Sequence, residues 1–179
     1  VFHDAAAAPE LRAVCLEGHG AHFSFGASVP EHLPDRVAGM LRRFDDLITA
    51  LLDSSVVVMA AVRGQCLGGG LELAALCHRI VASRDAKFGQ PEIVLGGLAP
   101  GASIILADRI GRRRAEDLCL SGRTIGADDA FRMGLVDEVT DGDAMAAALA
   151  YAREHLVPRS ASSLRLAVTA ARMGLSARL

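Results

Sequence analysis

Two glutamates and three consecutive glycines have the residue types and spacing that best fit catalysis. The glycines at residues 68–70 follow a β-branched run and precede a helix-favouring stretch. Glycine lets a ligand approach the main chain closely, and the first turn of a helix offers unpaired N–H groups at the positive end of its dipole. The turn could therefore hold an anion or a developing oxyanion. A tight strand-to-helix connection that needs positive φ explains the triplet equally well.

The two glutamates, Glu72 and Glu92, follow the glycines at different distances. Glu72 falls in the first helical turn, where the helix dipole favours the ionised carboxylate; it could act as a general base or be an ordinary charge at a helix start. Glu92 stands between Pro91 and an apolar run, and that segment alone favours a solvated loop position. Two carboxylates that reach one water could divide acid and base chemistry between them.

Several catalytic and binding classes lack their motifs here. Lys87 is the only lysine, and no Gly-Lys-Ser/Thr occurs, so a P-loop is excluded. Neither Gly-x-Ser-x-Gly nor a Gly-x-Gly-x-x-Gly on residues 64–73 is present, which excludes a nucleophile elbow and a dinucleotide fingerprint there. The cysteines have no metal-like spacing, so we expect no metal site and reduced core cysteines at Cys15, Cys66, Cys77 and Cys119.

Composition favours one globular domain. The chain has 179 residues, of which 51% are hydrophobic and 22% charged, and its net charge is -2. This composition excludes a disordered chain and disfavours general nucleic-acid binding. No apolar run reaches the ~18 residues that a membrane-spanning helix needs. We therefore expect a protein that binds neither nucleic acid nor a membrane, and the expected reduced cysteines point to the cytoplasm.

The hydrophobic pattern indicates a mixed α/β chain with a helix-rich second half. Strands are expected at residues 13–17, 56–62, 80–82 and 136–139, and the β-branched run 56–62 is typical of a strand buried on both faces. Residues 87–101 are expected to be irregular. Helices are predicted at residues 36–52, 71–77, 102–108, 113–120, 127–132, 143–156 and 160–173.

Five segments in order resemble the crotonase family, the enoyl-CoA hydratase/isomerase superfamily. They are residues 23–27 (FSFGA), 67–74 (LGGGLELA), 86–96 (AKFGQPEIVLG), 117–123 and 127–137. The spacing of 20 positions between Glu72 and Glu92 is similar to that of the family's hydratases. The likeness covers nearly the whole chain.

The resemblance implies an α/β crotonase-like ββα spiral. Residues 1–140 would form the spiral core, and residues 141–179 a C-terminal helical region for trimerisation that is incomplete. The family's N-terminal hairpin and first helix would precede residue 1, and its helical end would continue beyond residue 179. Relatives of this kind form homotrimers or hexamers.

The resemblance also implies a mechanism. The amides of Ala27 and Gly69 would form an oxyanion hole for the thioester carbonyl of an acyl-CoA substrate. Glu72 would activate a water for attack on the β-carbon, and Glu92 would deliver a proton to the α-carbon. No cofactor is required, since coenzyme A is part of the substrate. The reaction would be that of a lyase in fatty-acid or aromatic-compound metabolism.

Some residues depart from the family pattern. Ser28 stands where the family usually has Asp, although a serine can still cap a helix. Residues 102–106 (ASIIL) replace a Gly-Gly-Thr-Gln-Arg-like run, which points to a non-standard acyl group. Residues 22–33 and 64–67 are most similar to hydratases of cyclohexa-1,5-diene-1-carbonyl-CoA in anaerobic aromatic degradation. An isomerase, another crotonase-type reaction on acyl-CoA and a non-catalytic interaction protein are the alternatives.

Overall fold

The computed structural model describes residues 8–174, which fall into two compact units. One unit contains Cys15–Gly26 and Val58–Ala150, and the other contains the described parts of Val1–Val14, Ala27–Val57 and Tyr151–Leu179. The predicted outer bounds at residues 1 and 179 lie outside the described residues.

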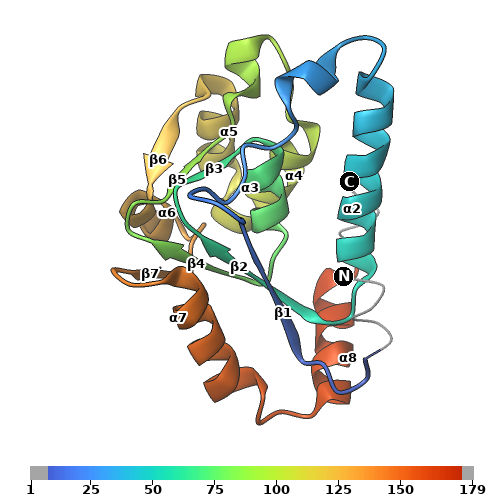
Figure 1. The fold of residues 1–179 in the computed structure, drawn as a ribbon, viewed down its shortest axis with the longest axis vertical. Coiled ribbons are helices and arrows are strands. Elements are labelled where there is room, and N and C mark those ends of the chain that lie inside the picture. The colour runs from blue at the N-terminus through green and yellow to red at the C-terminus, as the bar shows by residue number, and fades with distance from the viewer. Residues whose placement is uncertain (1–7, 175–179) are drawn as a thin grey trace. The chain divides into compact units, whose positions relative to one another are not determined.

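A four-stranded sheet lies mostly in the larger unit. Its strand order is β1 (Ala13–Glu17), β2 (Val57–Val62), β4 (Arg79–Ser83) and β7 (Glu138–Thr140), as Figure 1 shows. Strand β2 pairs in parallel with β4, and β4 with β7. Five of the six β2 residues are buried, which confirms the prediction from the β-branched run.

A second sheet comprises β3 (Gln65–Leu67), β5 (Lys87–Gly89) and β6 (Thr124–Gly126) in that order. Strand β5 pairs in parallel with β3 and antiparallel with β6. The expectation that residues 87–101 are irregular is therefore wrong at β5, and the sequence pattern missed all three strands. Strands of three residues are too short to show a period-two pattern, so pairing partners distant in sequence define them.

Most of the remaining chain in the larger unit is helical. Helix α3 (Gly69–Ala75) packs on α4 (Pro100–Ile110), which packs on α5 (Arg112–Ser121). A short 3-10 helix, η2 (Pro91–Leu95), contacts α5, and α6 (Ala127–Met133) contacts β6 and β7. Several large side chains fill the core of this unit, among them Met59, Leu71, Ile80, Phe88, Leu106 and Leu118.

The smaller unit contains η1 (Val29–His32), α2 (Val37–Asp53) and α8 (Ala161–Arg172). The predicted single helix over 143–156 is instead α7 (Ala144–Tyr151) followed by a π-helical turn, η3 (Ala152–Leu156). Ser28 occupies the N-cap position of η1, but its hydroxyl donates to the Glu31 carboxylate at 3.2 Å instead of capping the helix. Among the described residues, every helix is too short or too polar to cross a membrane.

Candidate active site

The glycine triplet forms a sharp turn between β3 and α3. Gly68 has a φ of +56°, which glycine adopts without strain, and its carbonyl accepts hydrogen bonds from the amides of Leu71 at 2.8 Å and Glu72 at 3.1 Å. Helix α3 begins at Gly69, two residues before the predicted start. As the first residue of the helix, Gly69 has an amide that no carbonyl of the helix can accept.

The segment Ser24 to Gly26 packs against this turn. The Leu67 amide donates to the Ser24 carbonyl at 2.9 Å. A Cβ on Gly26, whose φ is +81°, would lie 2.7 Å from the Gly69 nitrogen. Only a residue without a side chain therefore fits over the Gly69 amide. Ala27 belongs to the other compact unit, so the role of its amide stays a prediction.

Glu72 is a buried carboxylate held by the start of α4. Glu72 is only 6% exposed, and its Oε1 accepts a hydrogen bond from the Ala102 amide at 2.7 Å. A Cβ on Gly101 would lie 2.9 Å from the same oxygen. Burial raises the pKa of Glu72 above its usual value; the Ala102 hydrogen bond opposes this effect, and the charge of Glu92 adds to it.

Glu92 turns inward from η2 while its apolar neighbours face outward. Its Oε1 lies 2.6 Å from where a Cβ on Gly68 would stand. Glu92 is half-buried, whereas Val94 is 69% and Leu95 74% exposed. The interpretation of Glu92 as a solvated loop residue, drawn from this segment alone, is wrong. The fold of η2 reverses the usual rule that charged residues lie outside and apolar residues inside.

The structure thus brings Glu72, Glu92 and the Gly69 amide to one turn. Glu92 contacts Gly68, the residue before α3, and Glu72 lies in the first turn of that helix. The two carboxylates interact electrostatically, since the charge of Glu92 raises the pKa of Glu72. A backbone donor beside two coupled carboxylates can bind a polarised carbonyl and move protons to and from a nearby carbon or water.

Cys119 is a neighbour of this site that the sequence did not reveal. It lies half-buried on α5, which packs on α4. Burial raises the pKa of its thiol, and the charges of Glu92 and Glu72 raise it further. Cys66 and Cys77 are buried as predicted, but Cys15 and Cys119 are only half-buried. The position of Cys119 follows from the packing of α4 on α5, for which the sequence has no local signal.

The raised pKa of Glu72 predicts that Glu72→Gln stabilises the protein at neutral pH. The folded state holds this proton more tightly than the unfolded chain, so the free energy of unfolding decreases as pH rises from about 4.5, the ordinary pKa, through the folded-state pKa. Glutamine keeps the acceptor for the Ala102 amide but removes the buried charge. We expect Tm to rise by about 2–4 °C at pH 8 and to change little at pH 4, as measured by calorimetry. A lower Tm at pH 8 would contradict this electrostatic account.

Comparison with protein families gives a match over the whole sequence. A family model described as enoyl-CoA hydratase/isomerase matches residues 1–179. The chain belongs to the enoyl-CoA hydratase/isomerase family. Its α/β fold is that of this crotonase family, as predicted, because solved structures, an enoyl-CoA hydratase subunit of Geobacillus kaustophilus among them, superimpose on nearly the whole chain. The glycine turn, Glu72 and Glu92 lie in segments that carried the resemblance.

Individual family members differ in their similarity to this chain. The chain is 54% identical over 165 residues to the cyclohexa-1,5-dienecarbonyl-CoA hydratase of Thauera aromatica, covering 92% of this chain and 64% of the relative. It is 37% identical to a probable enoyl-CoA hydratase of Mycobacterium tuberculosis, with 89% and 63% covered. The chain therefore spans somewhat less than two thirds of these relatives.

Solved structures agree over a similar extent. Pseudomonas aeruginosa DspI superimposes with a TM-score of 0.89 at 29% identity, covering 98% of this chain and 70% of that chain. The enoyl-CoA hydratase of Bacillus anthracis gives a TM-score of 0.88 at 27% identity, covering 97% and 70%. The fold of this chain is thus shared by both solved structures.

Proposed function

We propose that the protein is a hydratase that adds water to the double bond of an unsaturated acyl-CoA thioester. The observation that carries this proposal is the buried Glu72, held by the Ala102 amide at the same glycine turn that Glu92 contacts. Hydration removes a proton from water and delivers a proton to the α-carbon, and two neighbouring carboxyl groups can divide these two transfers. The enoyl-CoA hydratases among the relatives support the same reaction class.

In the proposed reaction, the oxygen of water forms a bond to the β-carbon while Glu72 accepts its proton. The electron pair of the carbon–carbon double bond moves toward the thioester carbonyl and produces an enolate. The amides of Gly69 and Ala27 stabilise that oxygen, and one such donor contributes about 2.7–4 kcal/mol in other enzymes. Glu92, which holds the one proton of the pair at the start of this step, then delivers it to the α-carbon. The proton taken up by Glu72 passes back to Glu92 and restores the pair. The pair titrates as a unit, and the raised pKa of Glu72 makes it a stronger base near neutral pH.

The Thauera aromatica relative is named for a cyclic dienoyl-CoA, and it supports the same class of substrate for this chain. We therefore assign cyclohexa-1,5-diene-1-carbonyl-CoA as the proposed substrate, within anaerobic aromatic degradation and without a cofactor. A homotrimer or hexamer, a trimerisation region at residues 141–179 and a cytoplasmic location remain predictions.

Product mass distinguishes the proposed reaction from its alternatives. The purified protein is incubated with cyclohexa-1,5-diene-1-carbonyl-CoA or with crotonyl-CoA, and the thioesters are analysed by mass spectrometry. We expect a product heavier by one water, formed faster from the cyclic dienoyl-CoA. A product of unchanged mass but altered retention would indicate isomerisation instead. Two unaltered thioesters would contradict catalysis and favour a non-catalytic interaction protein.

A further inference from the structure

Helix α3 carries both Glu72 and the Gly69 amide, yet it has only seven residues. A helix this short has little stability of its own, so tertiary contacts must fix its position. Its first turn is held by α4, through the Ala102 amide on the Glu72 carboxylate. Its last turn ends in carbonyl groups that the helix itself cannot satisfy.

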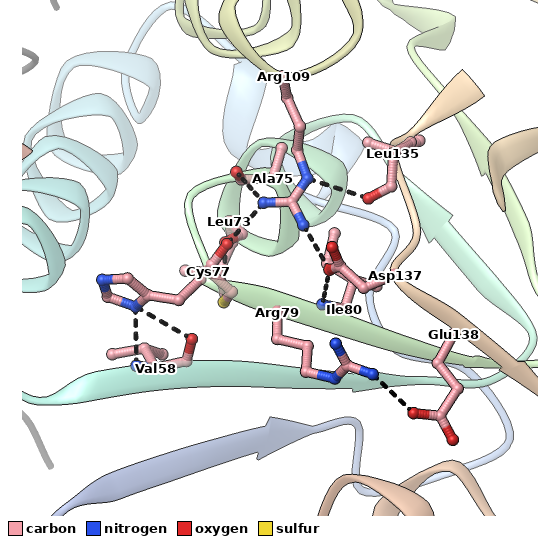
Figure 2. Close-up of polar contacts among 11 residues, drawn as sticks. Val58, Leu73, Ala75, Cys77, Arg79, Ile80, Arg109, Leu135, Asp137 and Glu138 are labelled. Carbon is pink, nitrogen blue, oxygen red and sulfur yellow. Dashed lines mark hydrogen bonds and ion pairs between the residues drawn. The ribbon is translucent and has the colours of Figure 1, made fainter. Parts of the chain in front are cut away.

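Arg109 satisfies those carbonyls at the end of α3. Its Nη1 donates to the carbonyl oxygens of Cys77 at 2.7 Å and Ala75 at 3.2 Å (Figure 2). Arg109 lies in the last turn of α4, seven residues after Ala102 and thus about 10 Å along the same helix. One helix therefore contacts α3 at both ends, first at the glutamate and then at the terminal carbonyls.

The arginine is itself fixed to the parallel sheet. Its Nε donates to the Leu135 carbonyl at 3.0 Å, and its Nη2 donates to Asp137 Oδ2 at 2.8 Å. The same carboxylate oxygen accepts the amide of Ile80, in β4, at 2.7 Å (Figure 2). The planar guanidinium thus reaches the end of α3, Leu135 and Asp137 through directed donors, and the Asp137 carboxylate connects it to β4. A lysine ammonium cannot reproduce this geometry.

From these contacts we infer that Arg109 is a positioning residue for the proposed hydration, which sets the place of Glu72 and of the Gly69 amide by fixing the far end of α3. The inference rests on the proposed function. A shift of about 1 Å in α3 would move the base and the oxyanion donor together, and misplacements of that size cost up to about 100-fold in rate.

The substitution Arg109→Lys tests this role, with Arg79→Lys as its matched control. Arg79 lies in β4 and donates to Glu138 Oε2, in β7, at 2.8 Å (Figure 2), so this ion pair joins two strands. We expect Arg109→Lys to lower kcat for the unsaturated acyl-CoA by about 10- to 100-fold with a smaller change in KM. Arg79→Lys should keep kcat within about twofold at a comparable loss of Tm.

The pH profile separates positioning from general stability. The Ala102 hydrogen bond lowers the pKa of Glu72, whereas burial and Glu92 raise it. A displaced α3 weakens that bond, so the acidic limb of the kcat profile should move to higher pH in Arg109→Lys. Two other titratable groups lie near Glu72: Glu92 and the Cys119 thiol, whose pKa is raised by burial and by the charges of both glutamates. The substitution replaces neither residue. A purely stabilising arginine would leave this limb where it is.

A second variant keeps the test decisive if Arg109→Lys does not fold. Asp137→Asn removes the charge that anchors the guanidinium but keeps an oxygen for the Ile80 amide, and we expect the same shift at smaller amplitude. A folded Arg109→Lys with unchanged kcat and pH profile would overturn the inference, as would failure of both variants to fold, because the arginine would then serve the fold as a whole. Absence of hydration by the unmodified protein would instead refute the proposed function.

Discussion

Replacing either glutamate by glutamine should abolish most of the hydratase activity. We expect kcat for the unsaturated acyl-CoA to fall by about 10²- to 10⁴-fold in Glu72→Gln and in Glu92→Gln, the usual contribution of a general acid or base. Glutamine retains the size and the acceptor oxygen of glutamate, so Glu72→Gln still accepts the Ala102 amide. Only the proton-transferring carboxylate is lost. Steady-state kinetics with product quantification by mass spectrometry measures the effect.

The double variant tells whether the carboxylates act together. Both carboxylates are assigned to the same reaction, and residues that act as a unit have non-additive effects on the rate. The kcat of the variant that combines Glu72→Gln with Glu92→Gln should therefore be little lower than that of the less active single variant. Glu116→Gln is the matched control: this exposed glutamate lies on α5 and pairs with Arg112 at 2.7 Å. It should retain full activity. Hydration at more than a tenth of the original rate in both single variants would show that the assigned roles are incorrect.

A methyl group on Gly26 should block the amide of Gly69. The new Cβ would stand 2.7 Å from the Gly69 nitrogen, closer than real Cβ atoms approach a backbone atom. Either the amide becomes inaccessible to a carbonyl oxygen or the segment moves away from α3. In both cases one oxyanion donor is lost, so we expect Gly26→Ala to lower kcat by about 10²- to 10³-fold.

Backbone strain must be separated from that steric effect. Gly26 has a φ of +81°, a conformation in which alanine is strained by about 1–2 kcal/mol. Gly134→Ala is the matched control, because Gly134 has a φ of +84° and open space where its Cβ would stand. Denaturant unfolding should show the cost of backbone strain in both variants and a further loss from the steric contact in Gly26→Ala, and only Gly26→Ala should lose activity. Equal activities in the two variants would exclude the blocked amide.

The kind of chemistry could be predicted from local sequence. The β-branched run and the glycine triplet specify a strand, a turn and a helix start, and the structure contains β2, the glycine turn and α3 in that order, with the short strand β3 before the turn. The required positive φ lies at Gly68. These features depend on residues that are neighbours in the chain, so propensity and periodicity are sufficient to indicate them.

Burial of the second glutamate depends on contacts that are distant in sequence. In its own segment, Glu92 is the polar residue beside Ile93, Val94 and Leu95, and the pattern therefore indicates that it faces water. The structure turns Glu92 toward Gly68, which is 24 positions earlier, and exposes its neighbours. That reversal requires β5 to pair with β3, and no local pattern encodes a pairing between such short strands.

By itself, the sequence determined which groups could do the chemistry: a backbone donor at Gly69 and two carboxylates at Glu72 and Glu92. The tertiary structure alone decided how they are held, with the Ala102 amide on Glu72, Cys119 beside the pair and Arg109 at the far end of α3. The physical reason is the range of the interactions. Turn and helix preferences act over a few residues, whereas burial, pKa and helix placement depend on groups that only the folded chain brings into contact.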